Sequence, residues 1–141
     1  MTERQFVQEV TETLGCDAQR GESVIFAVFQ ELSHRLTANE AADVASQLPV
    51  GLKRLWNGGA VESREPFDRP VEKIHRAELI GRVRWRAVLP DDDEAERAVR
   101  AVFRALQRLL GSPSGREGEA LEVFSQLPKD LKALWLDAAR E

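Results

Sequence analysis

The strongest candidate for chemistry in this chain is a short basic cluster, Arg82-Val83-Arg84-Trp85-Arg86. Guanidinium groups contact phosphates and an interleaved indole can stack on a base, so a nucleic-acid surface would use this composition. The net charge of −4 and the pI near 5.3 give no overall attraction to polyanions. We therefore expect weak nucleic-acid binding at most, with a protein partner as the alternative contact for Arg82, Arg84, Trp85 and Arg86.

A helical pattern explains the same cluster without a ligand. Four apolar residues nearby would share one buried stripe of a helix and leave the arginines on its solvated face. These four are Leu79, Ile80, Val83 and Ala87. The arginines could also pair with the acidic residues of segment 91–96.

The residues typical of catalysis or metal binding are isolated. His34 and His75 are the only histidines and lack the paired spacing of a zinc site. Cys16 is the only cysteine, so an intrachain disulfide is excluded. A helix N-terminus could lower the pKa of this thiol, but the adjacent Asp17 opposes that shift, and we expect Cys16 to fill space between helices. We expect no catalytic, cofactor-binding or metal-binding residues.

The segment Gly111–Gly118 has the glycine content of a phosphate-binding loop. No strand is predicted before it, Gly-Lys-Ser/Thr is absent, and Glu117 and Glu119 would repel a phosphate. We therefore interpret it as a loop between helices. Trp56 and Trp135 follow Leu-rich segments, and we expect each to close a core and to direct its indole N–H to a partner. Their alternative role is to line a shared ligand cleft.

Composition places the chain among folded globular proteins. Apolar residues make up 43% and charged residues 31% of its 141 residues, which excludes a disordered chain and predicts one domain over residues 1–141. The longest apolar run, Val24–Phe29, is too short to cross a bilayer, and we recognise no signal peptide. With its single cysteine, the chain is expected in the cytoplasm.

Two passages of the chain recur, which indicates a tandem duplication. Residues 27–32, Ala-Val-Phe-Gln-Glu-Leu, return at 101–106 as Ala-Val-Phe-Arg-Ala-Leu, an offset of 74. Residues 46–56, which begin Ser-Gln-Leu-Pro and end Leu-Trp, return at 125–135, an offset of 79. The difference of five residues places an insertion in the Gly-rich loop.

Each copy shows four helical patterns, so we predict an all-α bundle of about eight helices with approximate internal two-fold symmetry. The expected units are repeat one at 1–57, a connector at 58–74 and repeat two at 75–141. In repeat one the helices are expected at Glu3–Leu14, at Asp17–Leu36, from the capping box Thr37-Ala38-Asn39-Glu40 to Gln47, and from Pro49 onward. The second helix of each copy is the most apolar, and these two should pack together.

Three features recur in both copies: a hydrophobic-x-x-x-Val opening, an Ala-Val-x-x-x-Leu central helix, and a Gln-Leu-Pro corner at 47–49 and 126–128. With these features nearly the whole chain resembles the bacterial domain-of-unknown-function family 2267. The resemblance implies an all-helical fold in the bacterial cytoplasm. It implies no activity, so no catalytic residue is carried over.

The leading functional hypothesis is a non-enzymatic protein-interaction module that uses exposed helix faces or the connector, with a homodimer as one of its forms. The second is a small-molecule binder or enzyme with a site between the repeats, which buried and unpaired carboxylates there would favour. The third is weak nucleic-acid binding through the Arg82–Arg86 cluster. Neither a metal ion nor a membrane is an expected partner.

Overall fold

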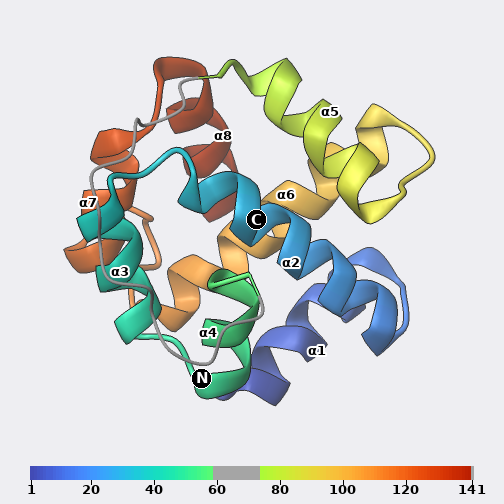
Figure 1. The fold of residues 1–141 in the computed structure, drawn as a ribbon, viewed down its shortest axis with the longest axis horizontal. Coiled ribbons are helices and arrows are strands. Elements are labelled where there is room, and N and C mark those ends of the chain that lie inside the picture. Colours follow the sequence, from blue (N-terminus) through green and yellow to red (C-terminus); the bar gives the residue numbers. More distant parts are fainter. Residues whose placement is uncertain (59–73, 141) are drawn as a thin grey trace.

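The computed structural model describes residues 1–58 and 74–140, and within these ranges it contains eight α-helices and no strand. The all-α fold class is therefore confirmed. The helices are α1 (Glu3–Leu14), α2 (Ala18–Ser33), α3 (Ala38–Ser46), α4 (Val50–Trp56), α5 (Arg76–Ala87), α6 (Asp92–Leu109), α7 (Gly118–Gln126) and α8 (Lys129–Ala139). Figure 1 shows their arrangement, with α2 and α6 in the middle.

Side chains just before several helices determine where those helices begin. Thr2 and Gln5 form a complete capping box at α1, Asp17 accepts a hydrogen bond from the Arg20 N–H, and Asp91 accepts one from the Glu94 N–H. The expected end of α2 at Leu36 is wrong, because the helix ends at Ser33. Backbone hydrogen bonds over three residues tighten the chain there, and Leu36 is still brought into the core.

The capping box expected at the start of α3 is only half formed. Thr37 Oγ1 accepts a hydrogen bond from the Glu40 N–H at 3.2 Å, as predicted. The Thr37 N–H, however, donates to Oε1 of Gln126 at 2.8 Å instead of to the Glu40 side chain. An amide from α7 thus takes the capping role of Glu40, and the Glu40 carboxylate is buried instead.

The two Gln-Leu-Pro corners separate α3 from α4 and α7 from α8. Leu127 is extended, with ψ of 145°, because the ring of the following proline disfavours helical geometry. We expected Pro49 to be the first residue of its helix. Instead Pro49 and Pro128 are both N-cap residues, with ψ of 154° and 157°.

One cluster of buried hydrophobic side chains includes residues from all eight helices. The second and sixth helices pack on each other, as expected from their apolar patterns. In addition α1 lies against α6, α5 lies against α2, and α3 contacts α7. The described halves of the chain therefore contribute to the same core.

Two of the three tryptophans, Trp56 and Trp135, pack in this core as predicted. Trp56 and Trp135 are 4% and 0% exposed, and their indole N–H groups donate to the carbonyls of Ala41 at 2.9 Å and Gly115 at 2.7 Å. The ring centroid of Trp56 lies 5.2 Å from that of Phe29. Trp135 and Phe103 form a similar pair at 5.1 Å. Each indole is thus packed and hydrogen-bonded.

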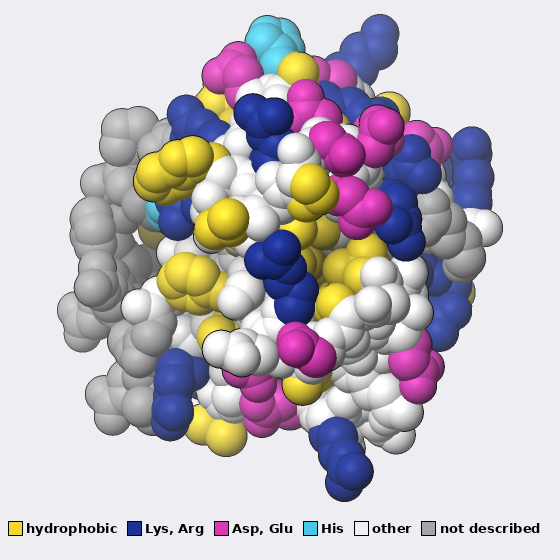
Figure 2. All heavy atoms as spheres, turned by 90° about the vertical axis from the view of Figure 1, so that its right-hand side faces the viewer, with side chains coloured by type: hydrophobic (Ala, Val, Ile, Leu, Met, Phe, Trp, Pro, Cys, Tyr) yellow, Lys and Arg dark blue, Asp and Glu magenta, His cyan; other side chains and the backbone are white. Residues whose placement is uncertain are grey.

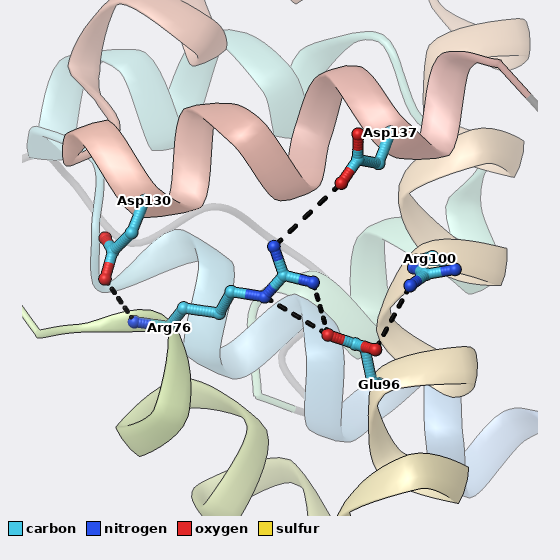
Figure 3. A network of polar contacts seen from close by, with 5 residues as sticks. All are labelled: Arg76, Glu96, Arg100, Asp130 and Asp137. Atoms are coloured by element: carbon cyan, nitrogen blue, oxygen red, sulfur yellow. Dashed lines mark hydrogen bonds and ion pairs between the residues drawn. The ribbon is translucent and has the colours of Figure 1, made fainter.

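A polar network at the start of α5 ties this helix to α6 and α8 (Figure 3). The Arg76 guanidinium binds Glu96 of α6 and lies 3.9 Å from Asp137 of α8, while the Arg76 N–H donates to Asp130 at 2.8 Å. Arg100 donates to the other Glu96 oxygen at 3.1 Å. The hydrogen bond from Arg76 holds the pKa of Glu96 below its usual range, against partial burial, which raises it.

None of the helices described by the structure is long and apolar enough to cross a membrane.

Candidate functional site

The exposed face of α5 carries the predicted contact residues. We call Arg82, Arg84, Trp85, Arg86 and the following Val88 the α5 surface. Trp85 is 82% exposed and Val88 75% exposed, the largest values among the exposed large hydrophobic residues that the structure describes. The predicted inner stripe is confirmed on the opposite face, with all four side chains buried: Leu79, Ile80, Val83 and Ala87.

Val88, the last residue of the α5 surface, has an unusual backbone conformation. This residue ends α5 in the left-handed region, with φ of 54° and ψ of 56°, where a β-branched side chain is strained. Arg20 of α2 supports the turn by donating to the carbonyls of Ala87 at 2.8 Å and Val88 at 3.0 Å. Gly15 has the same conformation at the end of α1, with φ of 68°.

Beneath the α5 surface lies a buried carboxylate that we did not predict from the sequence. Glu31 of α2 is 1% exposed and faces three guanidinium groups. Its oxygens lie 2.7 Å from Arg86 Nε, 3.5 Å from Arg35 Nη1 and 3.7 Å from Arg82 Nη1. A groove of about 490 Å³ opens beside it. The groove is lined by Glu31, Glu78, Gly81, Arg82, Trp85 and Arg86.

The arginines of the α5 surface thus have acidic partners within the chain. The pairing expected with segment 91–96 holds for Arg84, whose Nε lies 3.5 Å from Asp92. Arg82 and Arg86 instead contact Glu31, which is far away in the sequence. On the side of the molecule shown in Figure 2, cationic, acidic and hydrophobic side chains are interspersed among the described residues without forming a continuous basic area.

The structure does not assemble the isolated histidines and the cysteine into a site. His34 follows α2 as its C-cap and His75 precedes α5 as its N-cap, where its Nδ1 lies 3.3 Å from Asp130. Burial raises the pKa of the Cys16 thiol and the Asp17 charge adds to this effect, so the thiol is less reactive than a free one.

The Gly-rich segment connects α6 and α7, as expected, and its polar groups form hydrogen bonds with other groups of the chain. The Gly115 carbonyl accepts the Trp135 indole N–H, and the Ser112 hydroxyl accepts the Glu117 N–H at 3.0 Å. Gly115 has φ of +74°, and a Cβ there would lie 2.8 Å from Trp135 Nε1. This segment therefore positions the side chain of Trp135. The connector at 58–74 lies outside the described residues except at Gly58 and Ile74.

Three carboxylates meet where α3 contacts α7, a place that we call the α3–α7 junction. Glu40 and Asp43 of α3 and Glu119 of α7 each place an oxygen within 4.8 Å of the others. Glu40 is 4% exposed, and its Oε2 accepts no hydrogen bond from a described residue. Burial, a hydrogen bond shared with Glu119 and the charges of Glu119, Asp43 and Glu122 raise the pKa of Glu40 to about 9.

Both glutamines of the Gln-Leu-Pro corners reach across this junction. Gln47 donates to Glu119 Oε1 at 2.8 Å, and Gln126 accepts the Thr37 N–H. The doubled tripeptide was visible in the sequence, but its role in joining α3 to α7 was not. Glu40 and Glu119 are 79 residues apart in the sequence, as are the two corners. This equal spacing was the sequence signal that could have linked the two glutamates.

Comparison with known proteins gives a family. A search of curated proteins found no significant match. The family model of the uncharacterised conserved protein family DUF2267 matches residues 3–134, which is most of the chain and includes both Gln-Leu-Pro corners. The chain therefore belongs to the DUF2267 family.

Proposed function

We propose that this protein is a non-enzymatic protein-interaction module, that the α5 surface is its contact face, and that a second copy of the chain is its partner. The observation that carries the proposal is the exposure of Trp85, at 82%, on a helix whose other face is anchored in the core. Tryptophan and arginine are the residues that most often dominate protein interfaces. We also propose a bacterial cytoplasmic setting; the family resemblance implies the bacterial source, and the free thiol of Cys16 fits a reducing compartment.

The strain at Val88 supports a contact role. A non-glycine residue in the left-handed region costs about 1–2 kcal/mol, and glycine would avoid this cost. Val88 is 75% exposed, so its side chain gains little from packing within the chain. Contact with a partner would bury both Val88 and Trp85 and offset the strain.

The charges beside Trp85 favour a second copy as the partner. The cationic residues of the α5 surface are followed by the acidic run Asp91-Asp92-Asp93 at the start of α6. In Figure 2 acidic side chains gather next to cationic ones on this side of the molecule. A two-fold axis through such a face would bring the ion pairs of one copy beside those of the other with opposite charges adjacent, so the pairs within each chain can stay intact.

We also propose that α1–α4 and α5–α8 are two copies of one unit related by an approximate two-fold axis. Reciprocal contacts support this arrangement, since α1 packs on α6 as α5 packs on α2. The matching pairs of Trp56 with Phe29 and Trp135 with Phe103 support it as well. Under this proposal Val88 occupies the place of Gly15, and the exposed tryptophan is a feature of the second copy alone.

Sedimentation velocity and native mass spectrometry over a range of concentrations test the self-association. We expect a dimer that Trp85→Ala weakens about 10-fold or more, because truncating a central aromatic residue removes a large share of interface energy. Val50→Ala is the matched control, since Val50 is 61% exposed on α4, away from the α5 surface. A chain that stays monomeric at its highest soluble concentration, or equal effects of both variants, would contradict the proposal.

The ion pairs of the α5 surface weigh against nucleic acid as the partner. Binding a phosphate would require Arg86 to leave Glu31 at 2.7 Å, or Arg84 to leave Asp92 at 3.5 Å. Fluorescence anisotropy with labelled DNA and RNA at low salt checks this expectation. Tight binding that is lost on replacing Arg82, Arg84 and Arg86 would favour the nucleic-acid hypothesis instead.

A further inference from the structure

We propose that the α3–α7 junction binds one hard divalent cation, of the class of Ca²⁺, Mg²⁺ and Mn²⁺, through the carboxylates of Glu40, Asp43 and Glu119. From the sequence we expected no metal ligands, because these residues form no local motif. The proposal concerns a surface separate from the α5 surface and does not depend on self-association.

The positions of the oxygens fit such an ion. Hard divalent cations bind carboxylate oxygens at about 2.0–2.6 Å, so two oxygens on one ion lie no more than about 5 Å apart. The three side chains each offer an oxygen within 4.8 Å of the other two. Two ligands come from one helix at a spacing of three residues, and the third comes from α7.

The burial of Glu40 is an independent reason to expect a ligand. Its side chain is 4% exposed and its Oε2 accepts no hydrogen bond from a described residue. Buried polar atoms in proteins nearly always have a partner, and a buried carboxylate without one is costly. Capping does not explain Glu40, since Gln126 binds the Thr37 N–H in its place. A cation would satisfy this oxygen.

In the part of the chain that the structure describes, the surroundings of these carboxylates are acidic. Among the described residues no Lys, Arg or His forms an ion pair with Glu40, Asp43 or Glu119. The charges of Asp43 and Glu119 therefore have no cationic side chain among the described residues to balance them, and a divalent cation would balance them.

Two further features suit a binding site. Asp43 is exposed, so an ion can enter from solvent and keep water molecules as its remaining ligands. The Gln47 amide donates to Glu119 at 2.8 Å and orients this carboxylate, in the way that outer hydrogen bonds support metal ligands. The ion would link α3 to α7 and so join the two halves of the chain.

Isothermal titration calorimetry on the full chain, stripped of metal with a chelator, tests the site with CaCl₂, MgCl₂ and MnCl₂ separately. We expect one ion per chain for at least one of the three, together with a higher melting temperature, because an ion that binds only the folded state stabilises it. No binding heat and no shift in melting temperature at millimolar concentrations of all three ions would overturn the proposal.

Variants distinguish coordination from general attraction of cations. Glu119→Gln keeps the shape of the side chain and replaces a charged ligand oxygen with a neutral amide, and we expect it to weaken binding by about 10-fold or more. Glu122→Gln is the matched control, because it removes the same charge from the same helix without removing a ligand. Equal weakening by both variants would overturn the proposal. Asp43→Asn is an exposed second test that leaves the buried part intact, and binding unchanged in this variant would contradict the assigned ligand set.

Discussion

The sharpest prediction concerns Glu40→Gln in the metal-free protein. The amide has nearly the same shape as the protonated carboxyl and can donate a hydrogen bond to Glu119 without needing a proton. The native wild-type chain holds a proton on Glu40 up to about pH 9, whereas the unfolded chain releases it above about 4.5. We therefore expect the free energy of unfolding of the variant to exceed that of the wild type increasingly as the pH rises.

The magnitude follows from the same two pKa values. Because the pKa of Glu40 is raised in the folded state, its contribution to stability is fully present below about pH 4.5 and is lost as the pH rises toward 9. Each pH unit in this window lowers wild-type stability by about 1.4 kcal/mol relative to the variant. Between pH 5 and pH 8 the difference should grow by up to about 4 kcal/mol.

Urea unfolding followed by tryptophan fluorescence, in buffers containing a chelator, measures this difference. Trp56 and Trp135 are both buried and report on the two halves of the core. Glu122→Gln serves as the control, since its exposed side chain contributes the weakest of the charges that act on Glu40. If wild type and Glu40→Gln keep a constant difference from pH 5 to pH 8, Glu40 is ionised in the native state and the reasoning is refuted.

Three further predictions follow from single contacts. Glu31→Gln should lower stability by about 3 kcal/mol in urea unfolding, because it leaves guanidinium groups beside a neutral buried side chain; a loss below about 1 kcal/mol would contradict this role. Gly115→Ala should lower the melting temperature more than Gly111→Ala, since both have φ near +74° but only the first places a Cβ against Trp135, so equal losses would exclude the clash. Val88→Gly should raise stability by about 1 kcal/mol in urea while it weakens self-association, and a destabilised variant would show that Val88 is not strained.

Local patterns were sufficient to predict most helices. The apolar stripe of α5 was predicted residue by residue, and α1 was predicted with both ends correct. These features depend on helical periodicity and on caps within a few residues, so neighbouring positions carry the information. The end of α2 was predicted three residues too late. Near Ser33 the backbone changes to hydrogen bonds between residues three apart, and Leu36 is buried in the core. This change depends on tertiary packing and not on the preferences of neighbouring residues.

The candidate sites were predicted less completely. The arginines and Trp85 were recognised as a cluster, but Glu31 was not, because the residues that meet there come from two helices separated by about fifty positions. Glu40 was assigned to a capping box from its spacing. Gln126, 89 residues away from Thr37, competes for the same N–H and changes the role of Glu40 from a cap to a buried carboxylate.

The sequence by itself determined that this chain is all-helical, where its buried stripes lie, that Trp56 and Trp135 belong to the core, and which family it resembles. These properties follow from periodicity, proline geometry and composition, which act over short stretches of chain. Only the tertiary structure decided that the Glu31 carboxylate lies among arginines, whereas the Glu40 carboxylate lies among other carboxylates. Charge interactions depend on distance and burial, and these are established only when helices that are far apart in the sequence pack together.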